Sequence, residues 1–425
     1  MQTPTTDTYR DPHRWMVFFV IGMVYFFVYF HRVSTSVIVP DLLEAFQTHA
    51  AALGFMSSMY FYIYALEQPL VGYLTDRWGP IRVIGVWTLS AAAGCILFGL
   101  ATNIFWASVG RALIGFGVGG VYVPAIKAFS QWFRKKEFSL MIGLLMSVGN
   151  FGAVIATTPL AWSVDLWGWR ITFFVIGGIT LIFSFVALVF TRDKIEAMST
   201  QVSPENSPDH MAPSENTFLQ ILFSGRLWLL ATIFFGIYGT AITLQGLWAT
   251  PFLMSALGIS RIYASKLNML IPIGVIIGSP VIGWLINRIA LPKTTALQLI
   301  ILGYTLMWVG VAFCSSWLGT LGLSVVLLVM GVAIGGFIST FWGYIRETTP
   351  DKTLGLVSGL LNPAPFFGIA VFQVVTGAIL NRTERIGGLY PLSGFTLAFS
   401  VCVIFVAGCL GLSFFIRNTI VSVHK

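Results

Sequence analysis

Five ionisable side chains stand inside long apolar stretches of the sequence: His31, Arg32, Glu67, Arg111 and Lys127. If these stretches cross a bilayer, a charge near its centre costs at least ~2.5 kcal/mol, so each needs a partner or a function. A guanidinium can hold a carboxylate or phosphate through two parallel hydrogen bonds. A carboxyl or imidazole group can carry a proton. These residue types therefore indicate anion binding and proton transfer.

Arg32 belongs to a polar face of a helix. Tyr25, Tyr29, Arg32 and Ser36 follow one another at spacings of four, three and four residues, which places them on one side of that helix. We expect this face to line a cavity and to bind a substrate. The alternative is structural, with Arg32 pairing with Glu67 or with backbone carbonyl groups to hold helices together.

Glu67 and His31 are the candidates for proton coupling. Burial disfavours the charged form of a carboxyl group, so Glu67 is able to hold a proton at neutral pH. The alternative for Glu67 is a permanent salt bridge with Arg32 or Lys127. His31 titrates in the right range but points about 100° away from Arg32, where a hydrogen-bonded packing role is the alternative. Lys127 stands near a helix end, where its long side chain can reach water.

Membrane-spanning helices have to position these residues. With 56% hydrophobic and 9% charged residues, the chain of 425 residues has too few polar groups to coat soluble domains. Crossing a bilayer takes about 20 residues. Apolar stretches of that length predict twelve spans, at 15–40, 53–74, 82–102, 104–131, 138–163, 169–191, 227–254, 264–286, 294–314, 318–345, 355–380 and 394–416.

The positive charge of the chain indicates its topology. The formal net charge is +8, yet the basic residues are scattered between apolar stretches and form no cluster that nucleic acid would need. With the N-terminus inside, most of them fall on the cytoplasmic side, and the exceptions are Arg170, Arg261, Lys266, Arg382 and Arg385. Both termini are therefore predicted to be cytoplasmic. The four cysteines lack metal or redox spacing, and we interpret them as packing residues.

The sequence also repeats itself. Gly-Tyr-Leu-Thr-Asp-Arg at 72–77 returns as Gly-Trp-Leu-Ile-Asn-Arg at 283–288, each at the end of an apolar stretch. Such a repeat predicts two copies of one unit. We expect a six-helix bundle at 1–191, a polar cytoplasmic linker at 192–217 and a second six-helix bundle at 218–425.

The loop after the second span, Gly72-Tyr-Leu-Thr-Asp76-Arg77-Trp-Gly79-Pro-Ile-Arg82, resembles the signature loop of the major facilitator superfamily. Twelve spans, a central linker and Arg111-Ala-Leu-Ile-Gly115-Phe-Gly117 in the fourth span extend the resemblance over nearly the whole chain. It implies an all-α polytopic membrane protein. Two pseudo-symmetric six-helix bundles are then expected to rock about a central site, opening it alternately to either side of the membrane.

The signature loop is expected to act as a gating motif. Asp76 can accept hydrogen bonds at a helix N-terminus and pair with basic residues, forming a latch that holds the cytoplasmic side shut in one state. The alternative is a solvated turn where Gly79-Pro80 breaks the helix. The motif comprises Gly72, Asp76, Arg77, Gly79 and Arg82 in the first copy and Gly283, Asn287 and Arg288 in the second. Because Asn287 is uncharged, a latch in the second copy should be weaker.

Tyr29-Phe30-His31-Arg32-Val33-Ser34 resembles the first helix of the organic-anion branches, which include anion:cation symporters and organophosphate antiporters. The resemblance implies that Arg32 and Arg111, on helices bordering the cavity, converge on one anion; a structural or proton-coupling role is the alternative for Arg111. Sugar-acid symporters have acidic residues where this chain has His31 and Val118. Phosphate-ester antiporters have a second arginine where the repeat places Thr243. A monocarboxylate or zwitterion is therefore favoured over a phosphate ester.

The second half lacks charged residues at the positions that match those of the first half. It offers hydroxyl, amide and aromatic groups for the rest of a substrate, among which we assign Tyr238, Thr243, Gln245, Trp248, Trp342 and Asn362 to substrate binding. The two halves are thus expected to be specialised, the first for charge and the second for shape and hydroxyl recognition.

These features predict a secondary active transporter of a small organic anion or zwitterion, working by proton-coupled uptake. A drug or metabolite efflux antiporter, and a sensor or scaffold that transports nothing, are the alternatives. No nucleophile, base or metal constellation stands near an interface, so we expect no enzyme, metal or cofactor. The expected partners are a small-molecule substrate, a coupling proton and the lipid bilayer, with no nucleic acid. We expect a monomer in the inner (plasma) membrane of a bacterium.

Overall fold

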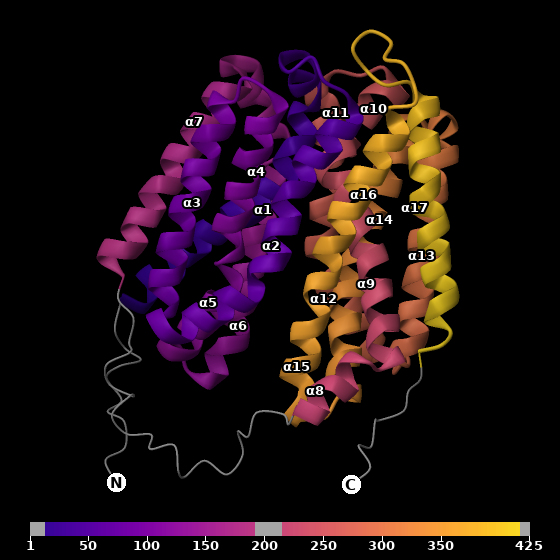
Figure 1. Ribbon diagram of the computed structural model, residues 1–425. Helices are drawn as coiled ribbons and strands as arrows, with labels where there is room; N and C mark the ends of the chain where they lie inside the picture. Colours follow the sequence, from indigo (N-terminus) through magenta and orange to yellow (C-terminus); the bar gives the residue numbers. More distant parts are fainter. Residues whose placement is uncertain (1–12, 192–214, 417–425) are drawn as a thin grey trace, which may run out of the picture.

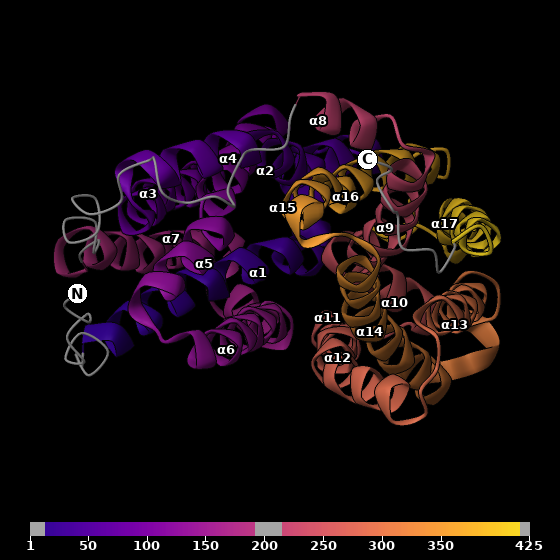
Figure 2. The ribbon, with the colours of Figure 1, turned by 90° about the horizontal axis from the view of Figure 1, so that it is seen from below.

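The computed structural model describes residues 13–191 and 215–416, which fold almost entirely into helices that run roughly along one axis (Figure 1). We call the end where α1 begins and α17 ends the lower end, and the opposite end the upper end. Most of the expected linker, and both termini, lie outside the described residues. Seen from the lower end, helices α1–α7 form one group and α9–α17 another (Figure 2).

The first group, which we call the N-half, contains α1 (His13–Ala45), α2 (Ala50–Trp78), α3 (Pro80–Leu100), α4 (Ile104–Gly119), α5 (Tyr122–Trp132), α6 (Lys135–Ile155) and α7 (Thr158–Phe190). A short helix α8 (Glu215–Leu222) precedes the second group. That group, the C-half, contains α9 (Gly225–Thr243), the π-helix η3 (Leu244–Trp248), α10 (Ala249–Leu257), α11 (Arg261–Asn268), α12 (Leu270–Arg288), α13 (Lys293–Phe313), α14 (Ser315–Thr348), α15 (Asp351–Leu361), α16 (Pro363–Leu380) and α17 (Leu392–Ser413).

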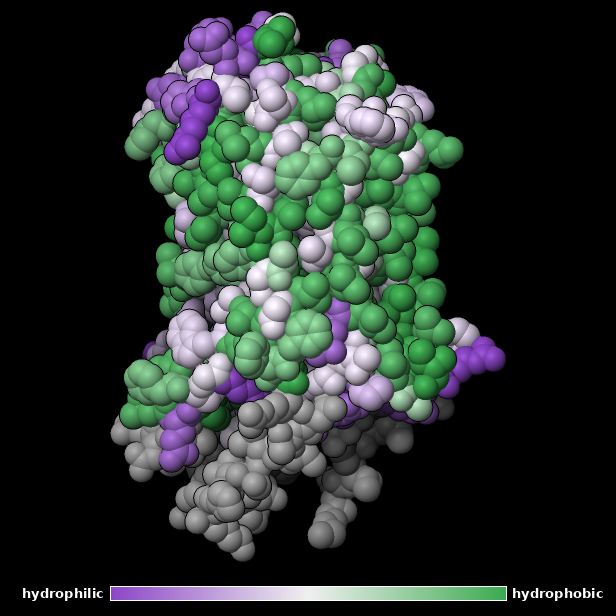
Figure 3. Space-filling model, turned by 90° about the vertical axis from the view of Figure 1, so that its right-hand side faces the viewer, coloured by the Kyte–Doolittle hydropathy of each residue, from purple (hydrophilic) through white to green (hydrophobic). Residues whose placement is uncertain are grey.

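Eleven helices or helix pairs in the described part of the chain are long and apolar enough to cross a membrane. The predicted second span is the exception among the twelve. Its helix, α2, has the necessary 29 residues but carries Glu67, Gln68, Asp76 and Arg77, which make it less apolar. The surface shown in Figure 3 bears a broad apolar band between polar ends, as expected for helices in contact with lipid.

The two halves meet along α2 and α16, where glycines allow the backbones to approach closely. A Cβ atom on Gly54 of α2 would lie 2.3 Å from the carbonyl oxygen of Gln373 in α16, and one on Gly377 would lie 2.6 Å from that of Ala50. Ring contacts between Tyr64 and Phe366 continue this interface downward, with centroids 4.3 Å apart. Small residues at helix contacts stabilise packing in membranes because they bring backbones together.

Candidate functional site

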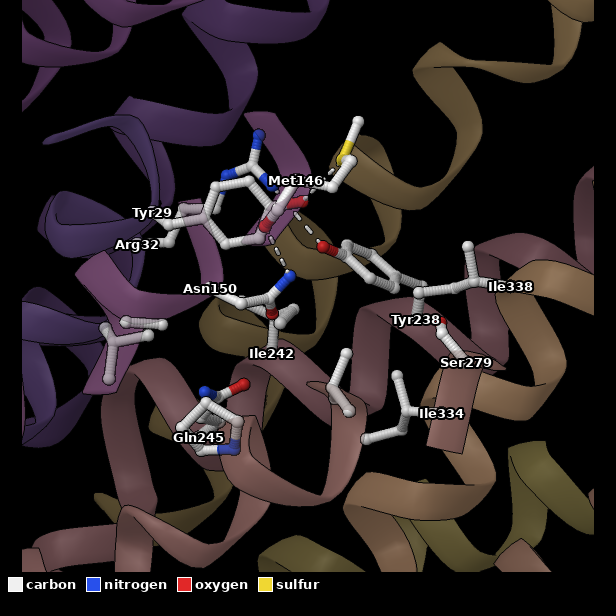
Figure 4. Close-up of a pocket in the computed structure, with 14 residues that line it drawn as sticks. Tyr29, Arg32, Met146, Asn150, Tyr238, Ile242, Gln245, Ser279, Ile334 and Ile338 are labelled. Carbon is white, nitrogen blue, oxygen red and sulfur yellow. Dashed lines mark hydrogen bonds between the residues drawn. The ribbon is translucent and has the colours of Figure 1, made fainter. Parts of the chain in front are cut away.

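A cavity of about 140 Å³ lies between the two halves, and Figure 4 shows its lining. The N-half lines it from α1 and α6 with Tyr29, Arg32, Val33, Met146, Asn150 and Ala153. The C-half lines it from α9, η3, α12 and α14 with Tyr238, Ile242, Gln245, Pro272, Val275, Ser279, Ile334 and Ile338. Four predicted binding residues therefore meet here: Tyr29, Arg32, Tyr238 and Gln245.

Arg32 is the one charged residue among those that line the cavity, and its side chain is held by aromatic rings. Its guanidinium carbon lies 4.4 Å from the ring centre of Tyr29, 5.2 Å from that of Phe366 and 5.4 Å from that of Tyr64. Nη1 donates a long hydrogen bond of 3.4 Å to the hydroxyl of Tyr238. Arg32 is only 4% exposed and forms no ion pair with any described residue. A permanent cation is thus held in an aromatic pocket without a described counter-ion.

Tyr25, which we expected in the cavity lining, lies behind it. Its hydroxyl donates to Sδ of Met146 at 3.5 Å, and its ring stacks on Tyr122 of α5 with centroids 5.8 Å apart. Tyr29 contacts Tyr25 at a centroid distance of 5.4 Å and itself borders the cavity. Tyr25 therefore supports the aromatic pocket, and it does not line the cavity in this conformation.

Ser36 lies above the cavity, where α1 contacts the C-half. Its Oγ donates to Oγ1 of Thr250 at 3.1 Å, and the backbone N–H of Thr250 donates to Ser36 Oγ at 3.1 Å. At the level of the cavity, α1 also packs directly on η3: a Cβ atom on Gly246 would lie 2.4 Å from the carbonyl oxygen of Arg32. These contacts close the upper side of the cavity.

Ion pairs join the halves at the upper end. Arg261 of α11 binds the carboxylates of both Asp41 in α1 and Asp165 in α7. The backbone N–H of Ala50 donates to the hydroxyl of Tyr390 at 2.8 Å. In the described part of the chain, the hydrogen bonds between the halves lie at the level of Arg32 or above it. The ribbons of the two halves diverge toward the lower end (Figure 1), so this conformation is closed at the upper end.

Arg111 does not reach the cavity, which corrects the expectation that it converges with Arg32 on one anion. Nη1 of Arg111 donates to the backbone carbonyl of His31 at 3.1 Å, and its guanidinium lies 5.0 Å from the ring centre of Tyr60. The side chain is fully buried inside the N-half, with Nε and Nη2 lacking hydrogen-bond partners among the described residues. Arg111 therefore joins α4 to the backbone of α1, in line with the structural alternative.

Glu67 lies inside the N-half and pairs with neither Arg32 nor Lys127. Its Oε2 accepts a hydrogen bond of 2.9 Å from Nε1 of Trp87 in α3. Its Oε1 has no hydrogen-bond partner among the described residues and lies against Gly119, where α4 ends. The side chain is 6% exposed. Neither salt bridge considered for Glu67 is present.

His31 is fully buried between aromatic rings of the N-half. Its ring lies 6.2 Å from that of Phe27 and 6.5 Å from that of Phe173, measured between centroids. Nε2 lies 3.5 Å from Sγ of Cys95, and Nδ1 has no partner among the described residues. The structure thus places His31 away from the cavity, in the packing environment that we considered as its alternative.

Comparison with known proteins assigns the family. Residues 21–372 match the Major Facilitator Superfamily. The chain belongs to this superfamily. It is therefore a secondary transporter and a multi-pass membrane protein, and it is not an enzyme, as the sequence predicted.

Relatives of the superfamily protein cover nearly its whole length. "Uncharacterized transporter YybO" of Bacillus subtilis is 26% identical over 417 residues, 93% of this chain and 94% of that protein. "Probable sulfoacetate transporter SauU" of Cupriavidus necator is 26% identical over 400 residues, 91% of each chain. "Probable galactarate/D-glucarate transporter GarP" of Escherichia coli is 24% identical over 430 residues, 93% of this chain and 95% of that protein. The predicted resemblance to organic-anion branches is confirmed by these relatives.

Solved structures of superfamily members share the fold. A bacterial homologue of the human lysosomal transporter Spinster, in an inward-facing and unoccupied conformation, superposes with a TM-score of 0.73 at 17% identity, covering 95% of this chain and 97% of that chain. The nucleoside transporter NupG gives a TM-score of 0.74 at 13% identity, covering 94% and 99%. The predicted all-helical architecture is confirmed; the orientation of the termini remains a prediction.

The remaining candidates of the C-half lie outside the cavity of this superfamily member. Trp248 donates from Nε1 to Thr376 Oγ1 at 2.8 Å, and Thr243 donates from Oγ1 to the carbonyl oxygen of Ile369 at 3.4 Å. Trp342 packs edge-on against Phe234 with centroids 5.9 Å apart, and Asn362 stands at the break between α15 and α16. Trp248, Thr243 and Trp342 thus join helices of the C-half to one another in this conformation.

The gating motif forms an ion pair within the N-half. Lys127 of α5 donates from Nζ to Asp76 at 2.6 Å and to the carbonyl oxygen of Thr75 at 3.1 Å. Arg77 donates to the hydroxyl of Tyr73 at 2.9 Å, and Gly79, between α2 and α3, has the positive φ of 91° that favours glycine. Gly72 has open space around its Cα, and Arg82 is exposed. In this conformation, Asp76 of the motif therefore joins α2 to α5 within the N-half.

The second copy of the motif uses different charges. Gly283 and Asn287 border a small pocket, while Lys293 binds Glu347 beside it and its side chain passes over Gly343. Arg288 lies on the ring of Trp284 at 4.9 Å. Asn287 therefore has no equivalent of the Asp76–Lys127 pair among the described residues.

Several residues of the site were not predicted from the sequence. Met146, Asn150 and Ser279 line the cavity, and the upper ion pairs use Asp41 and Asp165. Asn150 and Ser279 are polar residues inside apolar spans, a signal that could have selected them. The remaining lining residues of the C-half are apolar and resemble any other packing residue in the sequence.

Proposed function

We propose that the protein takes up a small organic anion across the bacterial plasma membrane and that Arg32 binds its anionic group. The observation that carries this proposal is the buried guanidinium of Arg32, which borders a cavity between the halves without a described counter-ion. Arginine stays protonated in proteins, and a buried unpaired charge is costly. A carboxylate or sulfonate in the cavity would supply the missing charge.

Two further observations support an anionic substrate. Nε of Arg32 has no hydrogen-bond partner among the described residues, so the guanidinium retains a donor for a ligand. Relatives of similar length have names that refer to sulfoacetate and to galactarate or glucarate. A cationic drug would meet Arg32 in the cavity, which argues against the efflux alternative.

We further propose that the coupling ion is a proton and that Glu67 carries it. Its carboxyl group has one oxygen hydrogen-bonded to Trp87 and the other without a described partner, and no cation of the described residues pairs with it. A carboxyl group in these surroundings can exist with or without its proton without breaking a salt bridge. His31 is the weaker candidate because rings and Cys95 enclose it.

Ligand binding tests the role of Arg32. Purified protein is screened by thermal shift with carboxylates, sulfonates and phosphate esters, and the best ligand is then measured on Arg32→Gln. Loss of one charge-assisted contact is worth about 1.5–3 kcal/mol, so affinity should fall roughly 10- to 150-fold. Lys266→Gln, which removes a cation on the exposed side of α11, is the control and should bind like the parent. Equal binding by Arg32→Gln and the parent would refute the proposal.

Transport in proteoliposomes tests the role of Glu67. The Glu67→Gln variant should still exchange labelled for unlabelled substrate but should no longer concentrate it under a pH gradient. Concentrative uptake by Glu67→Gln would exclude Glu67 as the carrier. Binding without any transport by the parent protein would instead favour a sensor or scaffold.

A further inference from the structure

The free polar groups of the cavity are fewer than its lining suggests. Nδ2 of Asn150 already donates to the carbonyl oxygen of Met146 at 2.9 Å, and Oγ of Ser279 donates to that of Gly335 at 3.0 Å. The hydroxyl of Tyr238 accepts the hydrogen bond from Arg32. The side-chain amide of Gln245 makes no hydrogen bond to a described residue, and Oδ1 of Asn150 and the hydroxyl proton of Tyr238 are also available to a ligand. Beyond Arg32, these three polar side chains are the main hydrogen-bonding partners that the lining offers to a ligand.

The wall contributed by the C-half is largely hydrocarbon. Ile242, Val275, Ile334 and Ile338 come from three different helices and line the same cavity that Arg32 borders from the N-half (Figure 4). The rings of Tyr29 and Tyr238 add further apolar surface. One cation therefore faces a cavity whose wall on the side of the C-half is mostly hydrocarbon.

This asymmetry disfavours a ligand with many hydroxyl groups. Each hydroxyl that leaves water for such a wall loses its hydrogen bonds, and the few free groups of the cavity cannot replace them. A ligand with an apolar body gains free energy from the same wall by leaving water. A second full charge on the ligand would also find no cation among the residues that line the cavity.

We infer that the substrate is a small monoanion, with a carboxylate or sulfonate head and an apolar body, and not a polyhydroxylated acid or a phosphate ester. This inference rests on the proposed function, because it takes Arg32 as the partner of the head group. Ile334 and Ile338 are then specificity-determining residues, since they form the hydrocarbon wall contributed by α14.

Probes that differ in one feature at a time test the head group and the body of the ligand separately. Hexanoate and gluconate have the same carbon chain and carboxylate, and gluconate adds hydroxyl groups on its other carbons. Hexane-1-sulfonate tests the alternative head group, and glucose 6-phosphate tests a doubly charged one. With the purified full-length protein, calorimetry should give hexanoate or hexane-1-sulfonate at least about tenfold higher affinity than gluconate or glucose 6-phosphate.

The outcomes distinguish the inference from the proposed function. Gluconate or glucose 6-phosphate binding as tightly as hexanoate, with binding lost in Arg32→Gln, would overturn the apolar-body inference and leave the anion site intact. Binding of none of the probes would also overturn it. Binding of hexanoate that is unchanged in Arg32→Gln would overturn the proposed function itself.

A variant of the wall provides a second measurement. Ile338→Ser should lower the affinity for hexanoate about tenfold and narrow its advantage over gluconate, because the apolar contact is lost and a hydroxyl is gained. Ile404→Ser on the outer face of α17, where the side chain is 71% exposed, makes the same substitution away from the cavity and should leave the ratio unchanged. If the ratio of hexanoate affinity to gluconate affinity is unchanged in both Ile338→Ser and Ile334→Ser, this wall does not determine the specificity.

Discussion

Replacing Gly54 by alanine should open the upper end of the protein. The new Cβ would lie 2.3 Å from the carbonyl oxygen of Gln373, whereas ordinary contacts begin at 3.4 Å, so α2 and α16 would have to separate by the difference, about 1.1 Å. The atom in the way belongs to the backbone and cannot rotate aside. Overpacking of this kind costs about 1–3 kcal/mol. Because the cost falls on the upper-closed state, the conformational equilibrium should shift about 5- to 150-fold toward upper-open states.

Distances between pairs of spin labels would measure this shift. One pair, at Lys136 in α6 and Ile289 after α12, reports the lower end, and a second pair, at Leu166 in α7 and Tyr263 in α11, reports the upper end; all four side chains are exposed. The exposed Cys314 is first replaced by serine. In Gly54→Ala, the population with a long distance at the upper end and the population with a short distance at the lower end should both increase.

Gly408→Ala on the exposed face of α17 is the control, because a Cβ there would also have nothing within 4 Å. It should leave both distance distributions unchanged. Unchanged distributions in a folded Gly54→Ala variant, or an equal shift in Gly408→Ala, would contradict the prediction. A loss of thermal stability without any change in distances would mean that the close approach serves packing alone.

Three further predictions follow from contacts outside the cavity. Arg261→Ala removes both upper ion pairs and should favour upper-open states by about 1 kcal/mol, roughly fivefold in the same spin-label measurement, with a smaller effect at high salt because the groups are partly exposed. Trp248→Phe should lower the free energy of unfolding by about 1 kcal/mol through the lost hydrogen bond to Thr376, without weakening substrate binding, and unfolding and calorimetry would check the two effects. Asp76→Asn should change the free energy of unfolding by less than ~1 kcal/mol, since the carboxylate of Asp76 is 79% exposed. A larger loss of stability would contradict the assignment of the Asp76–Lys127 pair as a weak surface contact between α2 and α5.

The membrane-spanning helices and the family could be predicted from the sequence, because a long apolar stretch and a repeated loop motif are each contained in a short segment of the chain. The face of Tyr29 and Arg32 was also predictable, since spacing gives the direction of a side chain around its helix. Spacing along one helix does not indicate the height at which a neighbouring helix packs against it. Ser36 shares the face of Arg32 but lies where α1 contacts Thr250, so it closes the cavity and does not line it.

The C-half was harder to predict for a structural reason. The π-helix η3 inserts a wider turn between α9 and α10, which changes the direction of the side chains that follow and places Trp248 on Thr376. Long-range charge pairs are equally hidden. Arg261 is visible in the sequence only as a charge that indicates topology, whereas its partners Asp41 and Asp165 come from two other helices.

The positions of Arg32 and Glu67 restrict how substrate and proton could be coupled. Tyr64 of α2 lies 5.4 Å from the guanidinium carbon of Arg32 and packs on Phe366 of α16. Glu67 follows three residues later, but it faces Trp87 and the end of α4, away from the cavity. The proposed anion site and the proposed proton site thus both involve α2, through Tyr64 and Glu67, without sharing a charge contact. Since α2 also carries Gly54 at the contact with α16, a movement of α2 would change both sites and the upper closure together, and coupling of this kind is mechanical in origin.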